Sequence, residues 1–337
     1  MSTRFERYSR QTVLPFIGER GQEKISRSRI LIIGCGALGT VMSDQLARAG
    51  VGELRLVDRD QIELSNLQRQ TLYEEKDLTR SKAEVASEKL SRINSQIQIR
   101  PYVTDLSYRN IEEIAQGVHL LMDATDNIST RFLLNEYSVK QEIPLIYTGV
   151  LGTHGMSLNC LPPHQNCLRC FMEEEPTQTG SCELMGILGP TVSILASYAV
   201  AEAFKLILGQ HDFLRNGLLY LDLWSQEHRV LKVPKNPECL VCGKKQWDYL
   251  QGKRGEEVSV LCGKNQVKYW RNQPLALVPL AQTLSAHGQI VSNRFFLKFI
   301  PKENPTIEMS IYPDGCIVMK GTEDEVQAKK LAQHYFG

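Results

Sequence analysis

The sequence lacks an excess of charge of either sign. Its 39 Lys and Arg residues are balanced by 38 Asp and Glu residues, so the formal net charge is +1. Without a strongly basic surface, the chain has no general electrostatic attraction to nucleic acid or to an anionic membrane. We therefore predict that it binds neither nucleic acid nor a membrane.

The sequence also lacks an apolar N-terminal segment. Its first residues, MSTRFERYSRQ, are charged from Arg4 onward and do not resemble a secretory signal. The best candidate for a membrane span is residues 186–204, GILGPTVSILASYAVAEAF, which is rich in small and hydroxyl residues and contains Pro190. We predict that this segment forms a buried or interface helix, and we expect the protein in the cytoplasm.

Nine cysteines are present, an odd number that does not suit the disulfide framework of a secreted protein. Four of them form two C-x-x-C pairs, Cys167 with Cys170 and Cys239 with Cys242. Two such pairs supply four thiolates for a closed, tetrahedral zinc site of the structural type. Because the pairs lie far apart in sequence, bound zinc would join a loop region to the end of the domain. The alternative is a set of four buried or redox-active cysteines.

The first half of the chain alternates predicted strands and helices. Strands are expected at 29–34, 53–58, 98–105, 118–127 and 144–150, and helices at 39–50, 82–94 and 130–141. Repeated βαβ units require parallel strands joined by crossover helices. The fold class is therefore predicted to be α/β, with a doubly wound, mostly parallel, Rossmann-like sheet.

The pattern changes from about residue 151. Loops carrying the C-x-x-C pairs are expected there, followed by the helix at Pro190 and two antiparallel strands at 217–224 and 228–233. We predict that residues 1–250 form one domain and that the polar stretch 251–257 is a linker.

Residues 256–337 are predicted to form a small α+β accessory module. Its expected elements are a hairpin at 258–270, a helix at 274–288, strands at 293–301 and 306–321, and a closing helix at 322–337. The second of those strands should turn back on itself at 313–315, and Thr322 and Glu325 have the spacing of a capping box. We expect the module to serve docking or dimer support.

Three glycines follow the first predicted strand. Gly34, Gly36 and Gly39 fit the pattern G-x-G-x-x-G, a turn that commonly places a phosphate at the start of a helix. Some of the same glycines can instead serve to pack a helix on a strand without any ligand. Asp58 ends the second strand, where an acid accepts hydrogen bonds from ribose hydroxyls. Since NAD and ATP both carry an adenosine ribose, Asp58 does not distinguish between them.

The loop after the second strand favours ATP. Its sequence, LSNLQRQ, places Asn66, Arg69 and Gln70 beside the glycine turn, and Lys82 begins the next helix. A dehydrogenase rarely needs a guanidinium beside its phosphates. An enzyme that breaks a triphosphate does, because charge gathers on the leaving pyrophosphate.

Two polar residues, Asp126 and Asn127, end another predicted strand. The carboxyl ends of the strands in a doubly wound sheet are where ligands bind, and a carboxylate there can hold the magnesium that accompanies ATP. Each residue alone could be a surface charge. Their clustering after successive strands argues for an ATP site.

These motifs resemble the ThiF/MoeB/HesA family of sulfur-carrier adenylyltransferases, which are related to ubiquitin-activating enzymes. The resemblance covers roughly residues 5–245 and includes both C-x-x-C pairs and Arg131. The other motifs, in family order, are RYSRQ (7–11), GCGALG (34–39), VDRD (57–60), SNLQRQ (65–70) and DATDN (123–127). Membership implies a doubly wound α/β fold and a homodimer with two ATP sites.

The resemblance implies a role for each matching residue. The backbone from Gly34 to Gly39, including Ala37, would cradle the nucleotide, and Asp58 would hold the ribose. Arg10 would reach into the partner subunit's site, and Asp126 would bind magnesium. Those expected at the phosphates are Asn66, Arg69 and Lys82, and the remaining nucleotide contacts are Asp60, Ser65, Gln70 and Asn127.

The implied reaction is attack of a carrier protein's C-terminal Gly-Gly carboxylate on the α-phosphorus of ATP, which forms an acyl-adenylate. Cys182 lies in a family motif whose cysteine accepts the activated carrier in some members and is dispensable for adenylation in others. The chain departs from the family at Ser81, where proline is common before the lysine, and at Ser181, where threonine is common. The implied pathways are thiamine, molybdopterin or related sulfur biosynthesis.

Two other functions remain open. Some relatives adenylate a peptide or act on a tRNA base, although the tRNA-acting ones generally lack the paired C-x-x-C motifs. A non-catalytic partner-binding subunit is the other alternative. It predicts the loss of at least one of Arg10, Arg69, Lys82 and Asp126, all of which are present.

Overall fold

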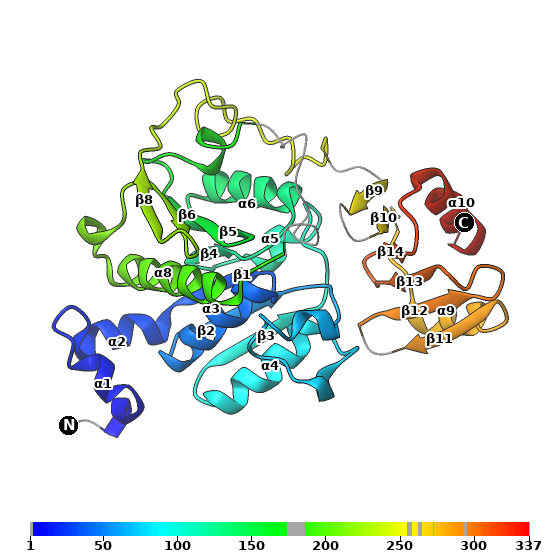
Figure 1. The fold of residues 1–337 in the computed structure, drawn as a ribbon, viewed down its shortest axis with the longest axis horizontal. Coiled ribbons are helices and arrows are strands. Elements are labelled where there is room, and N and C mark those ends of the chain that lie inside the picture. Colours follow the sequence, from blue (N-terminus) through cyan, green and yellow to red (C-terminus); the bar gives the residue numbers. More distant parts are fainter. Residues whose placement is uncertain are drawn as a thin grey trace. The chain divides into compact units, whose positions relative to one another are not determined.

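The structure is a computed structural model that describes residues 3–173, 186–254, 258–261, 265–271, 273–292 and 295–336. The described residues form two compact units (Figure 1). Unit 1 contains the residues up to 173 and those from 187 to 251, and unit 2 contains those from 252 onward.

Unit 1 is built on an eight-stranded sheet with the order β3-β2-β1-β4-β5-β6-β7-β8. The strands from β3 to β5 pair in parallel, and β6, β7 and β8 continue the sheet antiparallel. The parallel strands are β1 (Arg29–Ile33), β2 (Glu53–Val57), β3 (Gln98–Tyr102), β4 (Leu120–Asp123) and β5 (Leu145–Leu151). The others are β6 (His154–Cys160), β7 (Leu218–Asp222) and β8 (Glu227–Leu231). The strand order reverses between β1 and β4, so the predicted doubly wound fold is confirmed.

Helices cover both faces of this sheet. The helix α6 (Ile128–Gln141) packs on β4 and β5, and α8 (Gly189–Leu208) packs on α3 (Ala37–Arg48), β5 and β6. In Figure 1 the strands lie between α6 and α8. The remaining helices of this region are α4 (Lys82–Ile93) and the single turn α5 (Ile111–Ile114).

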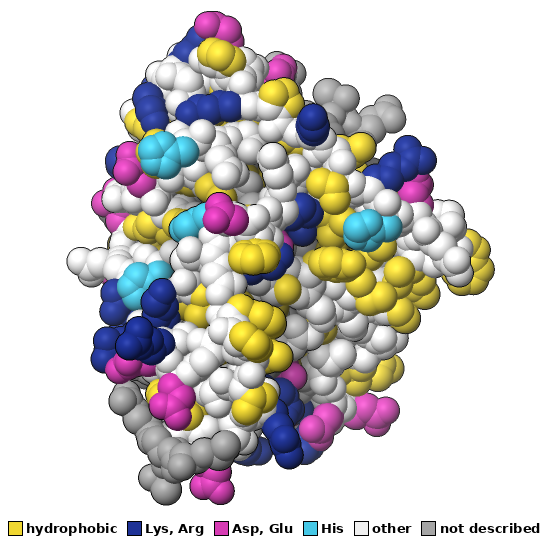
Figure 2. Space-filling view, turned by 90° about the vertical axis from the view of Figure 1, so that its left-hand side faces the viewer, with side chains coloured by type: hydrophobic (Ala, Val, Ile, Leu, Met, Phe, Trp, Pro, Cys, Tyr) yellow, Lys and Arg dark blue, Asp and Glu magenta, His cyan; other side chains and the backbone are white. Residues whose placement is uncertain are grey.

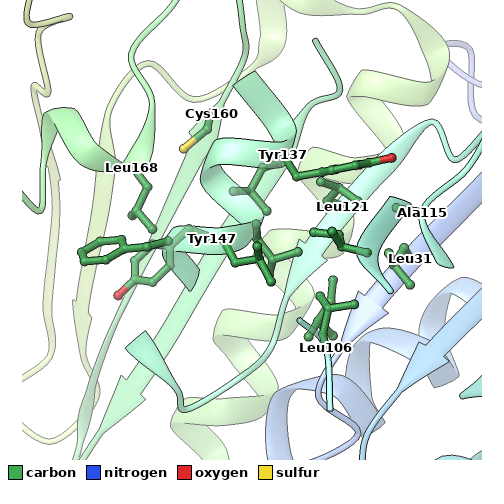
Figure 3. Packing of buried hydrophobic residues seen from close by; sticks show 14 of the residues in the cluster. Leu31, Leu106, Ala115, Leu121, Tyr137, Tyr147, Cys160 and Leu168 are labelled. Atoms are coloured by element: carbon green, nitrogen blue, oxygen red, sulfur yellow. The ribbon is translucent and has the colours of Figure 1, made fainter. Parts of the chain in front are cut away.

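The core explains why the two central parallel strands, β1 and β4, are largely apolar. Leu31, Leu121 and Leu145 come from three neighbouring strands and pack with Phe132 and Tyr137 of α6. Figure 3 shows Leu31, Leu121 and Tyr137 in this cluster. Strands with helices on both faces have no solvent side, so they carry no alternating polar residues.

The N-terminal segment is more ordered than its polar sequence indicates. It contains η1 (Thr3–Tyr8), α1 (Ser9–Thr12) and α2 (Gly18–Arg27). Buried amide hydrogen bonds hold it in place: Gln22 Nε2 donates to the Ala49 carbonyl over 2.9 Å, and Gln11 Nε2 donates to Gln22 Oε1 over 2.6 Å. Hydrophobic periodicity does not report contacts of this kind.

The helix α8 corresponds to the apolar segment noted in the sequence. Within the described part of the chain, it is the one helix long and apolar enough to cross a membrane by length and composition. Half of its apolar stretch is buried, and it packs on α2, α3, β5 and β6. These contacts are those of a core helix in a folded domain.

The strand β6 was expected to be loop and is a correction to the prediction. It pairs antiparallel with the whole of β5, from Leu145 opposite Cys160 to Leu151 opposite His154. The two strands join through a tight turn in which Gly152 adopts a φ of 60°. The alternating pattern of this strand is hidden because Ser157 and Asn159 are buried polar residues.

Unit 2 is a six-stranded antiparallel sheet with the order β11-β12-β13-β14-β10-β9 and two helices, in agreement with the predicted α+β module. The strands are β9 (Val258–Leu261), β10 (Gln266–Trp270), β11 (Gly288–Ser292), β12 (Leu297–Pro301), β13 (Glu308–Ile311) and β14 (Cys316–Lys320), and the helices are α9 (Leu277–Leu284) and α10 (Glu325–Phe336). The strand β11 differs from the prediction, which places Gly288 at the end of the helix 274–288 and residues 289–292 in a loop.

The surface of unit 1 agrees with the balanced composition. Figure 2 looks onto the side on which α2 lies, and both basic and acidic side chains occur across this face. Hydrophobic side chains gather on its right-hand part.

The cap of α10 differs from the predicted capping box. Asp324, and not Thr322, accepts hydrogen bonds from the first-turn amides, from Val326 N over 2.8 Å and from Gln327 N over 3.1 Å. The Thr322 hydroxyl accepts from Asp324 N over 3.1 Å and donates to Gln327 Oε1. Thr322 therefore holds the capping residue in place.

Replacing Asp324 by alanine should lower the stability of unit 2 by about 1 kcal/mol, because two helix amides lose their acceptor. The measurement is denaturant unfolding of the full chain, followed by a probe of the unit 2 transition. Glu323→Ala is the matched control and should change stability by less than about 0.5 kcal/mol. Equal effects of the two substitutions would contradict the assignment of the cap.

Candidate functional site

The candidate site lies at the carboxyl ends of β1, β2 and β4. The sheet changes direction between β1 and β4, and ligands of doubly wound sheets bind in the crevice at such a point. The glycine turn follows β1, the loop carrying Arg69 and Gln70 follows β2, and the loop carrying Asp126 follows β4. The sequence motifs therefore converge on one edge of the sheet.

Two of the three glycines are required for packing. Gly34 has a φ of 94°, and a Cβ atom there would lie 2.6 Å from the Ala124 carbonyl oxygen. A Cβ atom on Gly39 would lie 1.8 Å from the Gly34 carbonyl oxygen. Gly36 differs, because the nearest atom to its Cβ position is Gln70 Nε2 at 3.7 Å. The turn is thus closed on the protein side and open at Gly36, next to Ala37 at the start of α3.

Asp58 joins the end of β2 to the glycine turn. Its Oδ2 accepts a hydrogen bond from Cys35 N over 2.7 Å, and its Oδ1 accepts from Asp60 N over 2.7 Å. Burial raises the pKa of Asp58, and the nearby Lys82 opposes that shift. Each carboxylate oxygen retains a second lone pair, so these bonds leave acceptor capacity for ribose hydroxyls.

Lys82 is held by a counter-ion. It is the first residue of α4, it is buried, and its Nζ lies 3.1 Å from Asp60 Oδ2. Arg59 approaches the other oxygen of Asp60 at 3.6 Å and contacts Asp105 at 3.0 Å. Asp60 therefore positions the ammonium group in this structure.

The loop after β2 places its polar groups in different ways. Asn66 is buried in η2 (Leu64–Asn66), where its Oδ1 accepts from Glu63 N over 3.2 Å. Arg69 Nη1 donates to the Ser65 carbonyl over 2.9 Å. Gln70 is only 4% exposed, and its Oε1 has no hydrogen-bond partner among the described residues. A buried acceptor without a donor costs about 1–3 kcal/mol, which marks Gln70 as a position prepared for a ligand or a water.

The loop after β4 is fixed by a buried ion pair. Asp123 is fully buried, its Oδ1 accepts from Thr125 N over 3.0 Å, and its Oδ2 lies 3.4 Å from Arg131 Nε. Burial raises the pKa of Asp123 to about 6, although Arg131 opposes the shift. Arg131 also donates to the Thr125 carbonyl over 2.5 Å, and its guanidinium lies over the ring of Tyr147.

This loop presents its two predicted site residues differently. Asp126 is exposed at the tip. Asn127 caps α6, because its Oδ1 accepts from Thr130 N over 2.8 Å. Asn127 therefore has a structural role in the loop whatever else it contacts.

Two predicted residues are not brought to this site by the described chain. Arg10 is exposed on α1 and makes no contact with the glycine turn or the loops around it among the described residues. Cys182 lies outside the described residues, so its surroundings are not part of the structure.

Sequence reasoning missed three residues that organise the site: Tyr73, Asp123 and Arg131 had no assigned role. The Tyr73 hydroxyl lies 2.7 Å from the Cys35 carbonyl and 3.1 Å from the Lys82 carbonyl. In the sequence Tyr73 follows Leu72 and is typical of a core residue, so its hydrogen bonds to two distant carbonyls could not be predicted. The acid of Asp123 and the base of Arg131 were visible inside a motif, but their pairing was not.

The four paired cysteines form one cluster. Their sulfur atoms all lie within 4.8 Å of one another, with Cys167 Sγ 3.7 Å from Cys239 Sγ and Cys170 Sγ 3.4 Å from Cys242 Sγ. Asn135 Nδ2 donates to Cys167 Sγ over 3.6 Å. Four converging sulfurs with outer hydrogen bonds fit a closed tetrahedral zinc site. All seven cysteines described in the structure are free of disulfides.

Comparison with known proteins shows the family to which the chain belongs. Residues 8–241 match the ThiF family. The chain is 34% identical over 339 residues to the sulfur carrier protein ThiS adenylyltransferase of Bacillus subtilis, covering 98% of this chain and 99% of that one. It is 35% identical over 240 residues to the Escherichia coli protein of the same name, covering 71% and 95% of the two chains.

Solved structures show the same fold. The E. coli MccB structure with ATP matches with a TM-score of 0.63 and 24% identity, covering 71% of this chain and 75% of that one. The PaaA structure matches with a TM-score of 0.59 and 24% identity, covering 70% of this chain and 76% of that one.

The fold is that of a doubly wound α/β protein, and the polar residues of three loops gather at the switch point of its sheet. The chain belongs to the ThiF family. It is an adenylyltransferase, an activity that implies ATP and magnesium, and its four-cysteine cluster fits zinc.

The cluster generates a prediction about stability. The purified protein should contain one zinc ion per chain, and its removal by a chelator should lower the melting temperature, because binding energy at a structural site is folding energy. Metal analysis and thermal unfolding measure both. Replacing Cys316, a buried cysteine outside the cluster, by serine should leave the zinc content unchanged. A metal-free protein with unaltered stability would contradict the site.

Proposed function

We propose that the chain uses ATP to adenylate the C-terminal Gly-Gly carboxylate of a ubiquitin-like sulfur-carrier protein, for thiamine, molybdopterin or related sulfur biosynthesis. The observation that carries this proposal is the open corner at Gly36. It lies between the start of α3 and the buried side chain of Gln70, whose Nε2 is 3.7 Å from the Cβ position of Gly36, while Lys82 is held through Asp60. The names of the B. subtilis and E. coli relatives support the sulfur carrier as the substrate.

The chemistry needs no nucleophile from the enzyme. A carboxylate oxygen of the carrier attacks the α-phosphorus of ATP, and a new P–O bond forms as the bond from the α-phosphorus to the bridging oxygen breaks. The products are the acyl-adenylate and pyrophosphate. The enzyme contributes by positioning the reactants and stabilising the charge that gathers on the pyrophosphate.

Each site residue has a place in this scheme. The backbone from Gly34 through Gly36 and Ala37 to Gly39 cradles the phosphates at the start of α3, and Asp58 accepts the ribose hydroxyls. The cations Arg69 and Lys82 stabilise the pyrophosphate. The other proposed contacts are Ser65, Asn66, Gln70 and Asn127 with the nucleotide, and Asp60 through its ion pair with Lys82.

Asp126 is the proposed magnesium ligand. It is exposed at the tip of a loop whose base is fixed by the ion pair between Asp123 and Arg131. Magnesium held there would neutralise charge on the phosphates.

The working enzyme is proposed to be a cytoplasmic homodimer. Exposed apolar side chains on α8, β8 and the turn before β8 support an interface; they are Ile194, Tyr198, Trp224, Val230 and Leu231. In such a dimer Arg10 would serve the partner's site, since it has no local partner in the described chain. Cys182 remains the proposed acceptor of the activated carrier, and unit 2 the accessory domain.

The alternatives predict different features. A non-catalytic subunit would not retain both a held lysine at α4 and a presented acid at Asp126. Adenylation of another peptide or of a tRNA base would use the same edge of the sheet. Only an assay with the candidate substrates distinguishes these activities from adenylation of a sulfur carrier.

Exchange of label between pyrophosphate and ATP should require a carrier protein with an intact terminal Gly-Gly. Deleting that dipeptide should abolish exchange, because the attacking carboxylate is then displaced. Lys82→Ala should lower the exchange rate by roughly a hundredfold or more. Lys140→Ala, which removes an exposed lysine of α6, is the matched control. Exchange without any carrier would show that the substrate assignment is wrong.

The proposed dimer makes a second prediction. Arg10→Ala and Asp126→Ala should each inactivate the homodimer, because each removes one part of a composite site. In a mixed dimer one site carries both lesions and the other carries neither. Random exchange makes about half the dimers mixed, so activity should recover to roughly a quarter of the wild-type value.

Mass spectrometry of the mixture shows whether subunits have exchanged. If mixed dimers form and activity stays at the parental level, Arg10 does not act across the interface.

A further inference from the structure

The peptide group between Cys35 and Gly36 is oriented by the residues around it. A trans peptide is planar, so its carbonyl oxygen and its N–H point in opposite directions. The Cys35 carbonyl faces the protein interior, where the Tyr73 hydroxyl lies 2.7 Å away. The Gly36 N–H must therefore face away from Tyr73, on a residue whose Cβ position meets only Gln70 Nε2, at 3.7 Å. Among the described residues it has no hydrogen-bond partner.

Tyr73 is well placed to fix that orientation. It is buried, and it follows Gln70 in the loop after β2, with its own amide donating to the Gln70 carbonyl over 3.3 Å. Burial raises the pKa of Tyr73 well above its usual value, so the hydroxyl keeps its proton and can donate. The neighbouring peptide is held as well, since Cys35 N donates to Asp58 Oδ2.

The same hydroxyl reaches a second part of the site. The Lys82 carbonyl at the start of α4 lies 3.1 Å from it. One side chain thus contacts the glycine turn and the helix that carries Lys82, while its backbone belongs to the loop that carries Arg69 and Gln70. Three segments separated in sequence meet at one oxygen atom.

We propose that Tyr73 is a positioning residue that aims the Gly36 N–H at a phosphate group of the nucleotide. This inference rests on the proposed ATP site. Without the hydroxyl, the Cys35 carbonyl loses its buried donor and the peptide is free to rotate away. Loss of the hydroxyl should therefore weaken the binding of ligands that carry phosphates. The proposed ribose contacts of Asp58 do not involve the Cys35–Gly36 peptide, so the binding of adenosine should not change.

Tyr73→Phe tests the proposal, since it removes one oxygen and keeps the ring that fills the core. Dissociation constants for ADP and for adenosine should be measured by calorimetry on the full-length protein. We expect ADP to bind roughly fivefold more weakly to Tyr73→Phe, the size typical of one lost hydrogen bond. Adenosine should bind within about twofold of the wild type. In the exchange assay KM for ATP should rise more than kcat falls.

Tyr137→Phe is the matched control. Tyr137 is a buried tyrosine of α6 in the core of unit 1, away from the glycine turn in sequence and in its packing. Its substitution should leave the affinity for ADP unchanged, even if it lowers the melting temperature. A merely structural role of Tyr73 would weaken ADP and adenosine equally.

The outcomes separate the two proposals. Wild-type protein that binds ADP no more tightly than adenosine would overturn the phosphate site itself, and the role of Tyr73 with it. Wild-type protein that prefers ADP, with Tyr73→Phe unchanged in its ADP affinity, would overturn only the positioning role.

A second measurement does not depend on a substitution. With 15N-labelled glycine, the amide resonance of Gly36 in the wild-type protein should shift when inorganic pyrophosphate is added, because its N–H gains an acceptor. The resonance of Gly209, at the end of α8, should not move. A Gly36 resonance that stays in place would contradict the proposal.

Discussion

The close approach of the glycine turn to the loop after β4 is the contact on which the site depends. Gly34 permits it, since a side chain there would collide with the Ala124 carbonyl, and Gly39 lets α3 pack against the Gly34 carbonyl of the turn. Once the turn is pressed against this loop, the start of α3 lies beside the carboxyl ends of β2 and β4. The loops after β1, β2 and β4 then meet at one edge of the sheet. The backbone contact between the glycine turn and the loop after β4 therefore sets where the charged residues of these loops lie.

Three buried charges at this edge of the sheet, Lys82, Asp123 and Arg131, each have a partner of opposite charge. Asp60 faces Lys82, Arg131 faces Asp123, and Arg59 joins Asp60 to Asp105. Removing one member of such a pair leaves an uncompensated charge in a medium of low dielectric constant, which is costly. The pairs therefore hold charged groups in place at the edge of the sheet where the ATP site is proposed. Preorganised charge of this kind need not be rearranged during the reaction.

The sequence predicted what depends on local pattern. Buried parallel strands, the glycines of the first turn and the paired cysteines each leave a mark that is readable along the chain, and the α/β fold with its α+β module followed from them. Contacts made across the fold leave no such mark. The bridge from Tyr73, the pairing of Asp123 with Arg131 and the burial of Gln22 depend on distant segments. The strand β6 was missed because two of its buried residues are polar, and the cap of α10 because Thr322 and Asp324, two positions apart, both have side chains that can cap a helix.

The cysteine cluster has a mechanical consequence. It brings residues 167–170 and 239–242 to one point, so the intervening chain, with α8, β7 and β8, starts and ends at the same place. With zinc bound, tension applied to the chain beyond this point would be transmitted to the four cysteines and, through Cys167, to Asn135 of α6. Force from a unit that follows the cluster would then reach the four cysteines before it reaches β7 and β8. With zinc bound, the cluster would limit the force that the chain after Cys242 passes to the sheet of unit 1.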